Sequence, residues 1–586
     1  MIVIVCKFAT ILKTQKMNMN KILLMSLAAG TTALMSSCDL VKDFTYNVNP
    51  NPLEMHGDNV KFTVVVNVPE KGLNKKVKAE ITPKLGNTAI GTWVLQGEKI
   101  TGNGQTITFK PGGSATFDLE VPYRPDMEAA DLKVTGKIFK GTKDKGEIPE
   151  LKIADGTIIT PLMVRKDFKV IFEKDAIIRE TAKSTTATIN FDKAKSDVKA
   201  TEIKDKDIAD LLLWLKASEL NPKIQITSID IKGFASPDGV EDKNANLSNE
   251  RTRAARKAIV ELMKKSNMLN WADTTKYSIE GKGEDFEGFK DQLAVTTTIN
   301  EADKNLFIRI LEMSKDPIQR EKDMVNLGKS YTELEKDVFP KIRRAVITVN
   351  YKELGLTDDE IMTAAKNNPA SLGIEELLFA GARVTDLNEK AAIYQASAQN
   401  HSSDYRGHNN LGAVQFLQNK VADAKKSLEK ANSLKDNSTS KNNLAGVAIS
   451  EGDRTNARKL LNQSKGNSLD AGNVVFGYNS ASLDILDGNY SSAESNIKEN
   501  GFNKALAYLL QNKLPEAKAA LANEKESADV DYLKAIIASR GGEGSDAVVN
   551  NLKNAFAKDS SLKAKAAKDR EFVKLFADSN FTSAVR

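Results

Sequence analysis

The spacing of hydrophobic and polar residues divides the chain into segments with different patterns. From Phe44 to about Lys140, short runs such as KFTVVVNV, ATFDLEVPY and DLKVTGKIF alternate apolar and polar residues and are separated by turn residues. Several short strands at this spacing are typical of a β-sandwich. The next stretch, LKIADGTIITPLMV, has Asp155-Gly156 at its centre, which favours a hairpin turn. We therefore predict a β-sandwich-like domain with a hairpin extension over residues 38–180.

The middle of the chain mixes the periods of strand and helix. Short alternating strands end near Phe191 and Ile231, and apolar residues at i, i+3, i+4 and i+7 follow each of them. This order predicts an α/β unit with right-handed crossovers. An insertion with two helices, around Leu306 and Met324, precedes a closing strand at residues 345–351. The two helix faces consist of Ile208, Leu211, Leu212 and Leu215, and of Ala255, Ala258, Ile259 and Leu262.

From about Asp358 the chain is helical and repetitive. Leu411-Gly412 is followed 33 residues later by Leu444-Ala445, and small residues recur at matching offsets in later units. Each repeat of this kind buries its apolar face against its neighbours. The pattern resembles tetratricopeptide repeats, which implies an all-α solenoid over residues 358–586 with a surface for a protein partner. Its first helix pair is expected around Leu377, Leu378, Ala382, Ala391 and Ala398.

Composition excludes several classes of function. A length of 586 residues suggests roughly three or four domains, and 41% hydrophobic with 28% charged residues is ordinary for globular protein. Two cysteines exclude a disulfide framework and a cysteine-rich zinc site, and three scattered histidines give no zinc-protease spacing. Four of the lysines behind the formal charge of +6 lie in the first 37 residues, so no basic face for nucleic acid remains. We expect no enzyme, no cofactor and no metal site.

The amino-terminal residues have the pattern that is typical of an export signal. Lys21 precedes an apolar stretch over residues 22–35, and Ser36-Ser37 precede Cys38. Residues 1–37 are therefore predicted to be a signal peptide, with Met17 or Met19 as a more typical start. A cysteine after small residues resembles the bacterial lipoprotein processing site, which implies cleavage before Cys38, its acylation and attachment to outer-membrane lipid. The alternative is an ordinary secreted protein with an unpaired thiol.

Five separated features of the middle segment resemble the OmpA-like peptidoglycan-binding domain. They are INFD, the loop GFASPDG, a helix opening with Asn244, Leu247, Ser248 and Arg251, the run EGKGEDFEGF, and the paired arginines of IRRAVITVNY. The resemblance covers residues 185–352. It implies that a loop aspartate and a helix arginine bind the diaminopimelate residue of the peptidoglycan stem peptide. An arginine suits the carboxylate of such a zwitterion through its planar pair of donors.

The resemblance assigns the peptidoglycan-binding role to Ser236, Asp238, Asn244, Arg251 and Arg344. Ser236 stands where the family has its aspartate, and Asp238, two residues later, is the acid that could replace its charge. The alternative is a retained fold with weakened or lost wall binding. In that case Asn244 is a loop or capping residue and Arg344 a solvated or structural arginine.

The predicted fold is thus multidomain: a β-sandwich, an α/β OmpA-like domain and an all-α helical-repeat solenoid. Its order resembles outer-membrane lipoproteins of Bacteroidota-type bacteria, which implies a lipid-anchored protein on the periplasmic face. We expect it to link the outer membrane to peptidoglycan while the repeats bind an unknown envelope protein. The alternative is an assembly subunit of a secretion, barrel-insertion or fimbrial complex without strong wall binding. An enzyme with an unrecognised acidic site is a third, weaker hypothesis.

Overall fold

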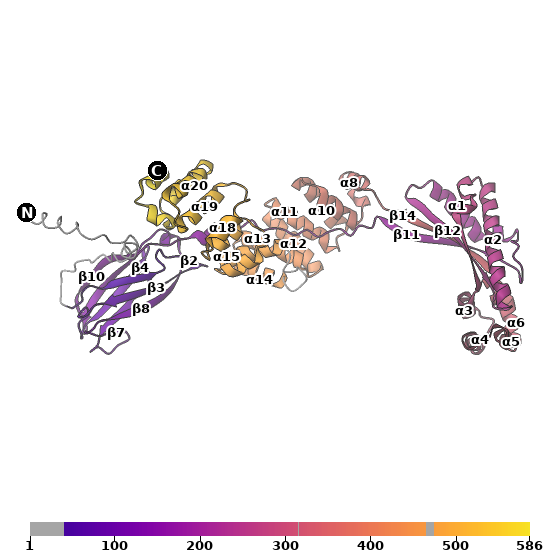
Figure 1. Ribbon diagram of the computed structural model, residues 1–586, viewed down its shortest axis with the longest axis horizontal. Coiled ribbons are helices and arrows are strands. Elements are labelled where there is room, and N and C mark those ends of the chain that lie inside the picture. The colour runs from indigo at the N-terminus through magenta and orange to yellow at the C-terminus, as the bar shows by residue number, and fades with distance from the viewer. Residues whose placement is uncertain (1–39, 315, 465–473) are drawn as a thin grey trace, which may run out of the picture. The chain divides into compact units, whose positions relative to one another are not determined.

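The computed structural model describes residues 40–314, 316–464 and 474–586 (Figure 1). The predicted signal peptide and Cys38 lie outside this range. The chain divides into two compact units, one made of Met1–Glu173 with Val384–Arg586 and the other of Lys174–Arg383. The unit boundaries therefore differ from the predicted domain boundaries, because the β-rich region and the repeats cluster together. Among the described helices, none has the length and apolar character of a membrane span.

The amino-terminal region of the first unit is β-rich, as predicted. One sheet has the order β1-β3-β2 with β8 paired to β3, and the other has the order β10-β9-β4-β6-β7 with β5 paired to β4. Alternate residues of β3, from Val60 to Val68, are buried and share one core with Ile81 and Leu132 of the second sheet. The strands are β1 (Thr45–Asn49), β2 (Met55–His56), β3 (Asn59–Val68), β4 (Lys78–Leu85), β5 (Thr88–Ala89), β6 (Trp93–Gly97), β7 (Gln105–Ile107), β8 (Gly113–Pro122), β9 (Leu132–Lys140) and β10 (Lys143–Ala154).

The predicted hairpin around Asp155-Gly156 does not form. The first half of the segment is the end of β10 and pairs with β9. The second half pairs elsewhere, because Ile158 exchanges backbone hydrogen bonds with Leu53 and Met55 at 2.7 and 2.9 Å. Distant residues therefore outcompete the local turn. After a short 3-10 helix (Thr160–Met163), the chain continues as a segment without helix or strand.

The second unit contains a four-stranded sheet of order β11-β14-β12-β13. β12 and β13 are parallel, and the other two pairings are antiparallel. Ile189, Ile231 and Ile347 from three strands pack with Leu215 and Ile259 from α1 and α2. The elements are β11 (Glu180–Asn190), α1 (Lys206–Glu219), β12 (Ile224–Ala235), α2 (Glu241–Lys265), β13 (Tyr277–Glu284) and β14 (Arg344–Leu354).

The insertion before β14 has more helices than the two predicted. It buries its own core, in which Phe289, Phe307 and Phe339 are fully covered. Its helices are α3 (Phe286–Val295), α4 (Glu301–Met313), α5 (Pro317–Val325), α6 (Lys329–Glu333) and α7 (Phe339–Ile342), with a π-helical turn at Leu334–Val338. Two further helices, α8 (Asp358–Asn367) and α9 (Ile374–Arg383), belong to this unit. The predicted first repeat pair is therefore divided, because its first helix is α9.

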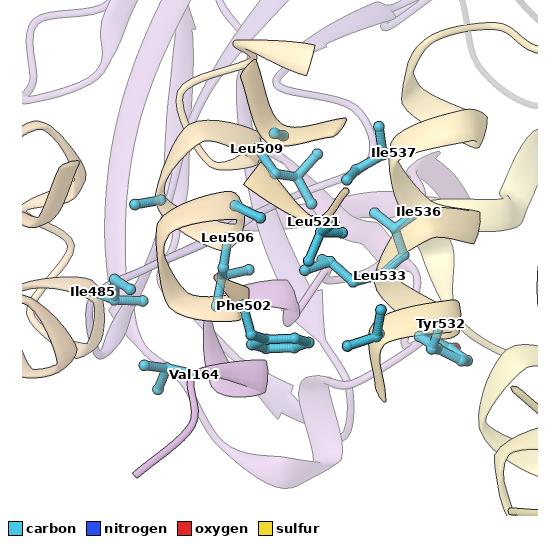
Figure 2. Close-up of a cluster of buried hydrophobic side chains, with 14 of the residues drawn as sticks. Val164, Ile485, Phe502, Leu506, Leu509, Leu521, Tyr532, Leu533, Ile536 and Ile537 are labelled. Atoms are coloured by element: carbon cyan, nitrogen blue, oxygen red, sulfur yellow. The ribbon is translucent and has the colours of Figure 1, made fainter. Parts of the chain in front are cut away.

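Helix pairs build the rest of the first unit and confirm the predicted helical repeats. Small residues allow close helix crossing: a Cβ added at Gly412 would lie 2.6 Å from Cγ of Leu428. Figure 2 shows part of the core, in which Val164 joins side chains from the helices. The helices are α10 (Leu387–Asn400), α11 (Tyr405–Leu417), α12 (Val421–Leu434), α13 (Ser438–Ser450), α14 (Arg454–Ser464), α15 (Val474–Leu486), α16 (Tyr490–Asn496), α17 (Phe502–Leu509), α18 (Leu514–Ala520), α19 (Ala528–Arg540), α20 (Ser545–Lys558), α21 (Leu562–Ala566) and α22 (Ser579–Val585).

Candidate functional site

The predicted peptidoglycan-binding residues gather where β12 ends and α2 begins. Ser236 and Asp238 lie in the connecting loop, Asn244 lies in the first turn of α2, and Arg251 lies farther along the same helix. Arg344 is the first residue of β14. We call this region the α/β corner. These residues therefore lie at one end of the sheet, and their partners define what the corner can bind.

The carboxylate of Asp238 is already paired within the chain. Arg343 donates from Nε to Oγ of Ser236 at 2.9 Å and from Nη2 to Oδ2 of Asp238 at 2.8 Å. Ser236 donates its hydroxyl to the same carboxylate, and Nζ of Lys193 lies 3.2 Å from it. Only 5% of the Asp238 side chain is exposed. An ammonium ligand would therefore have to displace an internal guanidinium.

Asn244 belongs to a second buried network. Its Nδ2 donates to the backbone oxygen of Ser236 at 3.1 Å and to Oε1 of Glu284 at 2.9 Å. Arg320, from α5 of the insertion, donates to Oε2 of Glu284 at 2.7 Å. Burial raises the pKa of Glu284, while the hydrogen bond from Asn244 and the charge of Arg320 act in the opposite direction. The insertion thus brings its own cation to the acid at this corner.

Arg251 has its three donor atoms directed at backbone carbonyls. Nε donates to Lys195 at 3.0 Å, Nη1 to Phe234 at 2.8 Å and Nη2 to Asp192 at 3.1 Å. The residue is 1% exposed. Burial, with the nearby charge of Arg343, lowers the pKa of the Arg251 guanidinium to about 10, so it stays protonated at neutral pH. In this conformation Arg251 joins the loop after β11 to the end of β12. Its donor atoms are all used by the backbone, so it does not offer a ligand carboxylate a free pair of N–H groups.

Arg344 pairs with Asp285, at 2.8 Å between Nη2 and Oδ2. Asp285 caps α3 by accepting from the amide of Gly288 at 2.9 Å. Burial raises the pKa of Asp285, and the charge of Arg344 lowers it. Nε of Arg344 is buried without a hydrogen-bond acceptor among the described residues. Arg344 therefore holds the start of the insertion, and it is Arg343 that contacts Ser236 and Asp238.

Sequence reasoning missed Glu284, Asp285 and Arg320, and chose Arg344 over Arg343 for the corner. The run EGKGEDFEGF contains both acids, so their place in a family motif was the signal that could have found them. Arg320 lies in the insertion, which has no counterpart in the motif. Among the residues that the structure describes, no group of three or more His, Cys, Asp or Glu side chains is placed to hold a metal ion.

The helical repeats carry a second candidate site, where a protein partner was expected. The alternate helices α11, α13, α15 and α17 direct asparagine side chains at an extended segment of the same chain, residues 164–173. We call this the asparagine groove. Each of four asparagines accepts from the backbone amide and donates to the backbone oxygen of one segment residue. The pairs are Asn503 with Arg165 (2.9 and 3.0 Å), Asn479 with Lys169 (2.8 and 2.8 Å), Asn443 with Ile171 (2.8 and 2.8 Å) and Asn410 with Glu173 (2.7 and 2.9 Å).

A periodic signal for this groove was present in the sequence. The dipeptide Asn409-Asn410 directly precedes Leu411-Gly412, and Asn442-Asn443 precedes Leu444-Ala445 at the same interval of 33 residues. Polar pairs recurring at the repeat period predict a polar stripe along one face of a solenoid. The apolar and small residues alone defined the repeats, so the stripe was missed.

No protein-family model matches the chain, and no curated relative matches it. Among solved structures, a tetratricopeptide repeat protein from Parabacteroides merdae is similar at 14% identity, over 37% of this chain and 91% of that chain, with a TM-score of 0.26. PilF from Pseudomonas aeruginosa is similar at 13% identity, over 37% and 98% of the two chains, with a TM-score of 0.28. The Cut9–Hcn1 hetero-tetramer of APC/C gives 11% identity, 64% and 77% coverage and a TM-score of 0.29. The helical-repeat fold rests on the helix pairs described above.

The contacts of Arg251 predict a large loss of stability on its removal. Arg251→Ala removes three hydrogen bonds to backbone carbonyls, of which that of Asp192 keeps another donor, the amide of Lys195, so we expect the free energy of unfolding of the α/β unit to fall by about 2 kcal/mol or more. Hydrogen exchange at the β14 amides measures this change. Arg253→Ala, at an exposed position of the same helix, is the matched control and should change it by less than about 0.5 kcal/mol. Unchanged exchange in Arg251→Ala would refute the structural role.

Proposed function

We propose that the protein is a non-catalytic scaffold of a bacterial cell envelope that serves as an assembly subunit for another envelope protein. The observation that carries this proposal is the union of the β-rich region and the helical repeats in one compact unit. Helical repeats generally present extended surfaces to protein partners. A β-rich region that forms one unit with such repeats would offer a partner a binding surface that spans both regions.

Several polar contacts join the two regions. Arg570 donates to the backbone oxygen of Ala129 at 2.5 Å and to Asp131 at 3.0 Å. Arg454 forms an ion pair with Asp58, and the ring of His56 meets that of Tyr490 edge-on at 5.0 Å between centroids. A buried hydrogen bond from Thr160 to Glu571, which also binds Arg540 at 2.7 Å, adds a further link. These contacts support a fixed arrangement within the unit.

The α/β corner favours the assembly subunit over a strong link to peptidoglycan. Arg251 is committed to backbone carbonyls, and Asp238 is committed to Arg343. Binding of a diaminopimelate group would have to break the Arg343 contacts, and breaking a buried ion pair is costly. Peptidoglycan binding therefore remains the second candidate. Its support is the family-like motif and the convergence of Ser236, Asp238 and Asn244 at one end of the sheet.

The membrane part of the proposal rests on the sequence around Cys38. Acyl chains on this cysteine would hold the scaffold at the outer membrane, since each buried methylene contributes about 0.8 kcal/mol. The periplasmic face is proposed because the α/β domain resembles a wall-binding module. No cofactor, metal or nucleic acid takes part in the proposed function.

Sedimentation with isolated peptidoglycan sacculi separates the two candidates. The assembly subunit should stay in the supernatant at physiological salt. A wall-linking protein should pellet with the sacculi, and Asp238→Asn should then weaken binding by about tenfold or more, because the loss of a charge-assisted contact costs about 1.5–3 kcal/mol. Arg253→Ala is the control for a general effect of charge. Pelleting that Asp238→Asn reduces and Arg253→Ala does not would overturn the assembly proposal in favour of the wall link.

Substitution of Cys38 tests the lipid anchor. In cells fed a labelled fatty acid, the wild-type protein should carry the label and fractionate with membranes. Cys38→Ser should lose both properties. Cys6→Ser, at the other cysteine of the chain, should keep them. Labelling that persists in Cys38→Ser, or an unlabelled wild-type protein, would contradict the anchor.

A further inference from the structure

The asparagine groove has the chemistry of a peptide-binding site. A carboxamide offers one donor and one acceptor side by side, which is the pattern that a backbone amide and carbonyl require. Four asparagines from four successive repeats each bind one residue of the segment in this two-sided way. Such contacts bind the backbone of an extended peptide and tolerate any residue that has an amide hydrogen. They therefore exclude proline at the four bound positions.

We propose that the asparagine groove is a binding site for extended peptides, that residues 164–173 of this chain are its resident ligand, and that the groove is closed to other peptides while this segment is bound. The proposal goes beyond the scaffold function, because it defines a site, a ligand class and a state of occupancy.

The carboxamides are held in place by one another. Nδ2 of Asn443 donates to Oδ1 of Asn409 at 3.1 Å, Nδ2 of Asn442 donates to Oδ1 of Asn443 at 3.2 Å, and Nδ2 of Asn479 donates to Oδ1 of Asn442 at 3.0 Å. These side chains are 1% exposed or less. Burial of a carboxamide is costly unless its hydrogen bonds are made. This network fixes the direction of Asn443 and Asn479 toward the segment. Asn410 accepts from Nδ2 of Asn409 at 3.0 Å and Asn503 donates to Oγ of Ser482 at 3.1 Å, so all four asparagines have the pre-organisation expected of a site.

The side chains of the segment define which peptides fit. Val164 and Phe168 are buried in the core of the repeats, and the ring of Phe172 stacks on Tyr394 at 6.0 Å. Apolar residues at four-residue spacing therefore face the helices. Arg165 adds a basic residue after the first of them, with its guanidinium 4.3 Å from the ring centre of Phe502 and 2.7 Å from Oε1 of Glu524. The ligand class is an extended peptide with this apolar spacing and this arginine.

Gly446 shows that the fit to the segment is close. A Cβ at this position of α13 would lie 3.3 Å from Cβ of Phe168 and 3.2 Å from Cζ of Phe416, and both distances are shorter than side chains usually pack. The missing side chain therefore leaves room both for Phe168 of the segment and for Phe416 of α11. Hydrogen bonds to the backbone of the segment and the close packing of α13 against Phe168 are two independent features of one site.

Hydrogen exchange in the full chain tests occupancy. The amides of Arg165, Lys169, Ile171 and Glu173 lie outside helices and strands, so protection can come only from the groove. We expect them to exchange at least about a hundredfold more slowly than an unstructured peptide. Asn443→Ala should speed exchange at Ile171 by about tenfold or more, and Asn462→Ala, at an exposed position of α14, should not. Exchange of these amides at the unstructured rate in the wild-type chain overturns the proposal.

A peptide in trans tests the ligand class. The probe is a fluorescent peptide with the sequence of residues 162–175, followed by anisotropy. The wild-type chain should bind it weakly, and a Phe168→Glu chain, whose own segment is held less firmly, should bind it at least about tenfold more tightly. A probe with the same substitution should bind neither chain. Equal binding of the unmodified probe by both chains, or no binding by a Phe168→Glu chain with native circular dichroism, overturns the proposal. If Phe168→Glu does not fold, the exchange result in the wild-type chain decides.

Discussion

Buried polar groups must be paired, and in this protein distant segments of the same chain supply the partners. The repeats bury asparagines whose hydrogen bonds are completed by the segment at residues 164–173, although the two lie more than 200 residues apart in the sequence. The α/β corner buries Asp238 and Glu284, and Arg343 and Arg320 neutralise them. An unpaired carboxylate or carboxamide at any of these positions would cost more than most single contacts contribute. This requirement fixes the path of the chain around both candidate sites.

The same requirement explains what could be predicted from the sequence. Elements with a strong local period, such as β3 and the helices of the repeats, follow from the pattern alone. The hairpin at Asp155-Gly156 failed because Leu53 and Met55, a hundred residues earlier, provide the competing hydrogen bonds. The resemblance named Ser236, Asp238 and Asn244, and these lie close together because a loop between a strand and a helix keeps sequence neighbours close. It could not show that Arg251 faces carbonyls or that the insertion brings Arg320, because both depend on tertiary contacts.

In both candidate sites, the asparagine groove and the α/β corner, the protein's own residues occupy the positions where a ligand would bind. A groove filled by its own chain directs partners to the remaining surfaces of the repeats and the β-rich region. At the α/β corner, whose acids are neutralised internally, the side chains that the sequence resemblance assigned to ligand binding contribute to stability instead. Both features agree with the proposed scaffold role, because internal pairing holds the chain in place at the asparagine groove and at the α/β corner.

The central claim, that the groove holds residues 164–173, is tested most directly by limited digestion with trypsin under native conditions. This segment contains Arg165, Lys166 and Lys169, and it has no helix or strand of its own. Proteases need a locally unfolded, accessible backbone. Cleavage after these three residues should therefore appear only after trypsin has cut the chain in exposed loops elsewhere. Mass spectrometry of the first products identifies the sites. Early cleavage after Arg165, Lys166 or Lys169 in the native protein would contradict the account.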